Sequence, residues 1–61
     1  MTIRQIRYKL KKDGLYLKRS GKDGYGTQLY NVLDEYGYVA HCQVYLDSIA
    51  QWYGGEYREE N

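Results

Sequence analysis

The stretch QLYNVLDEYGYVAHCQV, residues 28–44, predicts the central hairpin of a small antiparallel sheet. Residues 28–33 are predicted to be a strand with an ambiguous alternation, because Tyr30 and Val32 share one face while Leu29 and Leu33 share the other. Residues 38–44 are predicted to be the next strand, with Tyr38, Ala40, Cys42 and Val44 on one face. Between them, Asp34-Glu35-Tyr36-Gly37 has the composition of a short connection, with Gly37 suited to a positive φ. The two segments are therefore expected to pair as neighbouring antiparallel strands.

A further strand is predicted before this hairpin, over Leu15–Arg19. Leu15 and Leu17 share one side of it and are expected to face the core, while Tyr16 faces outward. Residues 20–24 are rich in Ser, Gly and Asp, so they predict the turn that leads into residue 28. The sheet is therefore expected to be a three-stranded meander.

One helix is predicted before the strands in the sequence and another after them. Thr2 and Gln5 have the spacing of a capping box, and Asp13-Gly14 is a suitable helix end. Asp47 is expected to cap a second helix, which Gly54-Gly55 would end. The apolar stripes of the two helices are Ile3, Ile6 and Leu10, and Leu46, Ile49, Ala50 and Tyr53, with Trp52 at the edge.

The predicted fold class is therefore α+β, with the order helix, three antiparallel strands, helix. A half-buried antiparallel sheet needs one apolar layer, so both helices are expected on the same face. Residues 1–55 are predicted to form one domain, and residues 56–61 a frayed acidic tail.

Composition limits the functional classes. Cys42 is the only cysteine, which excludes an internal disulfide and favours a reducing compartment. No apolar run is long enough to cross a bilayer, so we expect a soluble cytoplasmic protein with no membrane partner.

The chain has nine Tyr and no Phe. Because a small core cannot hold nine tyrosines, we expect several on the open face of the sheet, where they would form an interface. The candidate interface aromatics are Tyr16, Tyr36 and Trp52.

The charges are strongly segregated although the formal net charge is only +1. Residues 1–22 carry eight Lys or Arg and one Asp, whereas residues 23–61 carry one Arg and seven carboxylates. On the first helix, the predicted apolar stripe places a group of cations outward around Tyr8. The candidate residues for binding a partner or nucleic acid are Arg4, Arg7, Tyr8, Lys11, Lys12, Lys18, Arg19 and Lys22. A solvated helix face, or pairing with the acidic half of the same molecule, is the alternative explanation.

Catalytic and metal-binding motifs are not predicted. The spacing of Gly21, Gly24 and Gly26 matches neither of the phosphate-binding loops G-x-x-x-x-G-K-[ST] and G-x-G-x-x-G. His41 and Cys42 are adjacent in a strand and so point to opposite faces, which prevents a nucleophile–base pair. We expect Cys42 in the core and His41 on the sheet surface, and a zinc site would need further His or Cys ligands. No cofactor, metal or small-molecule substrate is expected.

The element order resembles that of the double-stranded RNA-binding domain. That family carries a basic cluster at the start of its second helix, where this chain has the acidic segment Leu46-Asp47-Ser48. A broader resemblance, over residues 2–14, 37–40 and 46–53, is to small Tyr-rich accessory proteins of bacteriophages and prophages, some of which inhibit host enzymes or defence nucleases. It implies a function class and assigns no residues.

Three functions are consistent with these features. The first is a non-enzymatic phage or mobile-element accessory protein that binds an acidic surface of a host protein, with inhibition of a host enzyme or defence nuclease as one form of this function. The second is a nucleic-acid-binding module that uses the basic first helix. The third is a structural homodimer formed through the sheet.

Overall fold

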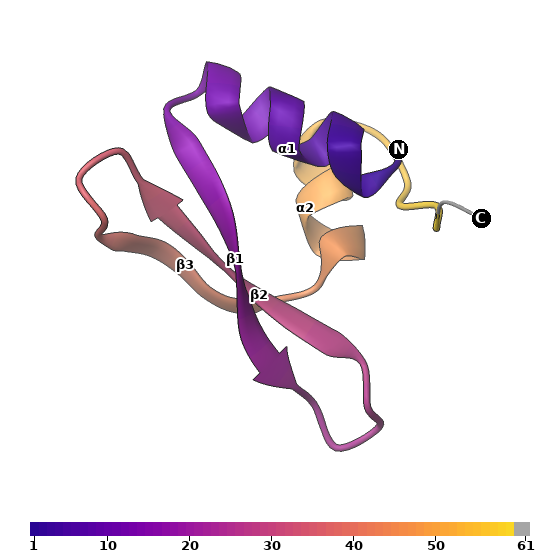
Figure 1. The fold of residues 1–61 in the computed structure, drawn as a ribbon. Helices are drawn as coiled ribbons and strands as arrows, with labels where there is room; N and C mark the ends of the chain where they lie inside the picture. Colours follow the sequence, from indigo (N-terminus) through magenta and orange to yellow (C-terminus); the bar gives the residue numbers. More distant parts are fainter. Residues whose placement is uncertain (60–61) are drawn as a thin grey trace.

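The computed structural model describes residues 1–59. The elements follow in the order α1 (Ile3–Lys12), β1 (Leu15–Lys22), β2 (Gln28–Asp34), β3 (Val39–Val44) and α2 (Leu46–Trp52). The strands form one antiparallel sheet with the order β1-β2-β3. Both helices lie on the same side of this sheet (Figure 1). The predicted fold class is therefore confirmed.

Local interactions define the limits of α1. Gln5 N–H donates to Thr2 Oγ1 at 3.4 Å, and Thr2 N–H donates to Gln5 Oε1 at 2.9 Å, so the predicted capping box is present. At the other end, Gly14 has φ +75° and starts the turn into β1. A residue with a Cβ resists this conformation, so glycine allows the chain to reverse directly after the helix.

Both hairpins of the sheet are closed by one kind of turn, Asp-x-Tyr-Gly-x, at residues 23–27 and 34–38. In each, the Asp Oδ1 atom accepts the N–H groups two and four residues later, at 2.9 Å in all four bonds. The glycine at the fourth position of each turn, Gly26 or Gly37, has φ +82° or +86°, respectively. The pentapeptides DGYGT and DEYGY therefore encode the same turn, a repeat that inspection of either loop alone does not reveal.

Three bulges change the strands from the predicted pattern. β1 continues to Lys22, and Ser20 is an extra residue between the pairs Arg19–Tyr30 and Gly21–Leu29. The prediction of a loop from residue 20 was therefore wrong for residues 20–22, because pairing with β2 overrides the turn preference of Ser and Gly. In β3, register shifts occur on both sides of the pair between Val32 and His41. Each of these shifts inserts one unpaired residue into β3.

The expectation that Cys42 lies in the core was wrong, because this residue is exposed. The bulge near the end of β3 explains the difference. Because Val32 pairs with His41 and Tyr30 with Val44, one extra residue lies between these pairs and the two-residue alternation is lost. Gln43 there has φ +51°, and its N–H donates to Asn31 Oδ1 at 2.9 Å. The side chain of Asn31 thus satisfies a backbone donor that the ladder leaves unpaired.

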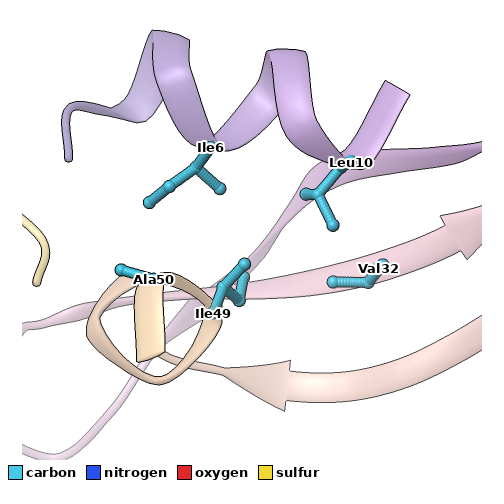
Figure 2. Close-up of a cluster of buried hydrophobic side chains, with 5 residues drawn as sticks. All are labelled: Ile6, Leu10, Val32, Ile49 and Ala50. Carbon is cyan, nitrogen blue, oxygen red and sulfur yellow. The ribbon is translucent and has the colours of Figure 1, made fainter. Parts of the chain in front are cut away.

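The core lies between the two helices and the middle of β2. Its fully buried residues are Ile6, Leu10, Val32, Ile49 and Ala50, which Figure 2 shows converging from α1, β2 and α2. Partly buried Leu15, Leu17, Leu46 and Tyr53 pack around them, as the apolar stripes predict. β3 contributes little, since only Val44 of that strand packs against this cluster.

Two further features differ from the sequence-based expectation. Residue Tyr45, not Asp47, is the N-cap of α2, and Asp47 lies in the first turn of the helix. After α2, the chain returns to the N-terminus: Arg58 N–H donates to Met1 O at 2.6 Å, and Tyr57 packs against the core. The expected frayed tail therefore has defined contacts through residue 58, and residues 60–61 of that expectation lie outside the described residues.

Candidate binding surfaces

The outward side of α1 is the most strongly charged surface of the helix layer. Ile6 and Leu10 are fully buried and fix the orientation of the helix. The opposite side carries a set of exposed residues that we call the α1 basic surface: Arg4, Arg7, Tyr8, Lys11 and Lys12. The Lys12 Nζ atom lies 4.8 Å from the centroid of the Tyr8 ring, which is 61% exposed. The structure thus brings five of the predicted site residues together.

Lys9 belongs to the same helix but has another role, which the sequence did not indicate. Its Nζ atom lies 5.8 Å from the centroid of the Tyr53 ring, just after α2. The Tyr53 hydroxyl donates to Asp13 Oδ2 at 2.9 Å. Desolvation, together with this hydrogen bond, raises the pKa of Tyr53 to about 12. These contacts connect the C-terminal ends of α1 and α2 and so help to hold α1 in place.

The three predicted cations of β1 do not lie on the α1 basic surface. Side chains of directly paired strand residues point to the same face of a sheet. Lys18 pairs with Asn31, on the face opposite the helices, whereas Arg19 pairs with buried Tyr30 on the helix face. Lys22 pairs with Gln28 near the end of the β1–β2 hairpin, which extends beyond the helices (Figure 1). The eight predicted binding residues therefore form no single patch.

The candidate interface aromatics are also separated. Tyr16 is 54% exposed and lies on the open face of the sheet, in a row with Leu33 and Val39 across the three strands. Tyr36 is 79% exposed at the tip of the second hairpin. The expectation of several tyrosines on the open face is not met by the strands, because their only other tyrosine, Tyr30, is buried on the helix face.

Trp52, the third candidate, packs against His41 of β3. The centroid of its ring lies 4.4 Å from that of His41, with the planes tilted by 41°. His41 is on the helix face because it pairs with Val32, and both rings remain exposed. Within residues 1–59, no group of three or more His, Cys, Asp or Glu residues is placed to hold a metal ion.

Asp34, the first residue of the second hairpin turn, has a structural role. Asp34 Oδ1 accepts the N–H groups of Tyr36 and Tyr38, so this carboxylate is used to close the turn.

No helix of the described chain is long and apolar enough to cross a bilayer. Comparisons of the chain with protein-family models, curated protein sequences and solved structures find no match.

Proposed function

We propose that this protein is a non-enzymatic binding protein whose α1 basic surface docks onto an acidic surface of a partner protein. The observation that carries the proposal is the one-sided charge composition of α1. The helix contains five Lys or Arg residues and no carboxylate. Arg4 and Arg7 are three residues apart, and Arg7 and Lys11 are four apart, which are the spacings at which helix side chains are neighbours.

Like charges at these spacings destabilise a helix by about 0.2–0.5 kcal/mol per pair. A purely structural helix of this fold would gain stability from Glu residues among its cations. The retained repulsion is relieved when carboxylates of a partner approach, so it is consistent with a site selected for binding. Tyr8 adds a rigid, half-exposed ring at the centre of the surface, of a kind that is enriched in binding hot spots.

The separation of the basic residues favours a protein partner over a nucleic acid, because the cations of β1 do not extend the α1 basic surface along a nucleic-acid backbone. A ten-residue helix is about 15 Å long. Even a single DNA-binding module buries about 600–1,000 Å² of protein surface and contacts several phosphates. Lys18 points away from the helix layer and cannot extend the α1 basic surface. The resemblance to small bacteriophage accessory proteins supports a host protein as the partner and inhibition as the consequence.

The test compares a labelled polyglutamate peptide with a labelled DNA duplex of equal charge, by fluorescence anisotropy at several salt concentrations. The parent protein is expected to bind the peptide. The double variant R7E/K11E should bind it about tenfold more weakly, because two exposed attractions become repulsions. The matched control is K18E/K22E, which changes the net charge equally but lies on the sheet, and it should bind like the parent.

The opposite pattern would contradict the proposal. If the parent binds only DNA, with log affinity falling steeply and linearly with log salt, the protein is a nucleic-acid-binding module. If R7E/K11E and K18E/K22E weaken peptide binding equally, net charge explains the attraction and α1 is only a solvated face. Capture from bacterial lysate, with and without nuclease, is the separate experiment that would identify the physiological partner.

A further inference from the structure

A depression of about 380 Å³ lies on a different part of the molecule, where three segments distant in the sequence meet. They are the start of β2, the junction between β3 and α2, and the segment after α2. We call it the tyrosine pocket after its principal residues: Tyr30, Tyr45, Tyr57, Asp47 and Glu59. Its volume is at the lower end of the range of about 300–1,000 Å³ that is typical of small-ligand sites.

Three of the nine residues that line the pocket are tyrosines. Tyr30 is only 5% exposed, whereas Tyr45 is 41% exposed and Tyr57 is half-buried. The Tyr45 hydroxyl donates to Asp23 Oδ2 at 2.6 Å, and Asp23 is itself fixed by the first hairpin turn. This bond raises the pKa of Tyr45 and lowers the pKa of Asp23, so the phenol stays a neutral donor beside an ionised carboxylate. The Tyr45 ring is therefore held in place before any ligand arrives.

The charged side chains that line the pocket, among residues 1–59, are the carboxylates of Asp47 and Glu59. Arg19 lies across the strand pair from Tyr30, but the cation–π contacts found within residues 1–59 both start from α1. The positive end of the α2 dipole also opens here, and Asp47 in the first turn of the helix offsets it.

We propose that the tyrosine pocket binds a small organic cation through a trialkylammonium or guanidinium head group. Aromatic faces carry negative electrostatic potential and attract such heads, and clusters of aromatic rings recognise quaternary ammonium groups in other proteins. The carboxylates of Asp47 and Glu59 would add attraction over a few ångströms, whereas they would repel an anion. This site is independent of the α1 basic surface, which selects the opposite charge.

The test is a titration of the ¹⁵N-labelled protein with choline, followed by NMR chemical-shift changes. The control ligand is the uncharged carbon isostere of choline, in which a tert-butyl group replaces the trimethylammonium. Choline should shift the amide signals of residues near Tyr30, Tyr45 and Tyr57 and bind about tenfold more tightly than the isostere. Methylguanidinium in a parallel titration distinguishes a guanidinium ligand from a quaternary ammonium ligand.

Variants locate the binding. Tyr57→Leu removes a pocket ring and Asp47→Asn removes a pocket charge without changing side-chain size, and each should weaken choline binding severalfold. The matched controls are Tyr25→Leu, at a hairpin tip where the ring is 96% exposed, and Glu35→Gln, and both should bind like the parent. Because Asp47 is exposed, its variant is expected to fold even if Tyr57→Leu does not.

Three results would overturn the proposal. The first is equal affinity for choline and its uncharged isostere, which would mean a merely apolar pocket. The second is unchanged choline binding by Asp47→Asn and Tyr57→Leu. The third is that inorganic phosphate, and not choline, shifts the pocket signals, which would assign the site to anions at the start of α2.

Discussion

Gly37, in the turn between β2 and β3, allows a direct test of how the repeated turn is built. Its φ is +86°, and a Cβ added there would meet no atom within 4 Å. Gly37→Ala should therefore cost stability through backbone strain alone, without a clash. Placing a residue with a Cβ in the left-handed region costs about 1–2 kcal/mol. For a domain of this size, that corresponds to a fall in Tm of about 4–16 °C.

The assay is thermal and urea unfolding followed by circular dichroism, with Gly24→Ala and Gly26→Ala in parallel. Gly24 also has open space around it but no positive φ, so its variant should match or slightly exceed the parent in stability. Gly26 is equivalent to Gly37 in the first turn, with φ +82°, and its variant should lose a similar amount. Equal Tm values for Gly24→Ala and Gly37→Ala would refute the conformational explanation.

Two further predictions concern the packing of the helices. Tyr53→Phe should remove part of the alkaline pH dependence: the raised pKa means that the contribution of Tyr53 is complete below pH 10.0 and is lost as the pH rises toward about 12, because the unfolded chain releases its proton first. The difference in Tm between parent and variant, measured from neutral to alkaline pH, should shrink over that window, and a constant difference would contradict this. Ile49→Ala removes a fully buried side chain and should cost about 2–5 kcal/mol, comparable with a total stability of about 3–9 kcal/mol, whereas Ile49→Val should cost about 0.5–1.5 kcal/mol. Urea denaturation measures both, and a folded Ile49→Ala variant with parental stability would place Ile49 outside the core.

The elements that the sequence predicted correctly are those governed by neighbours along the chain. The capping box of Thr2 and Gln5 and the glycine after α1 act within one helical turn. The turn at Gly37 needs only the five residues from Asp34 to Tyr38. The apolar stripes of α1 and α2 follow from helical geometry, and together with the amphipathic strands they permit essentially one layered arrangement.

The candidate surfaces were predictable only in part, for the same reason. The α1 basic surface depends on the orientation of one helix, which its own apolar stripe determines. The distribution of the β1 cations depends on sheet pairing: Lys18 lies on the open face while Arg19 and Lys22 do not, so a sum of charges along the sequence overestimates the size of the patch.

Tertiary structure alone decided the features that depend on register and on contacts between distant segments. One extra residue in β3 reverses the alternation around Cys42 and leaves that side chain exposed, although the local pattern gives no sign of the bulge. The bond between Tyr45 and Asp23 and the contact between Arg58 and Met1 join residues far apart in the chain. Local preferences cannot encode such pairs, because they form only when the helices, the hairpin and the final segment pack around one core.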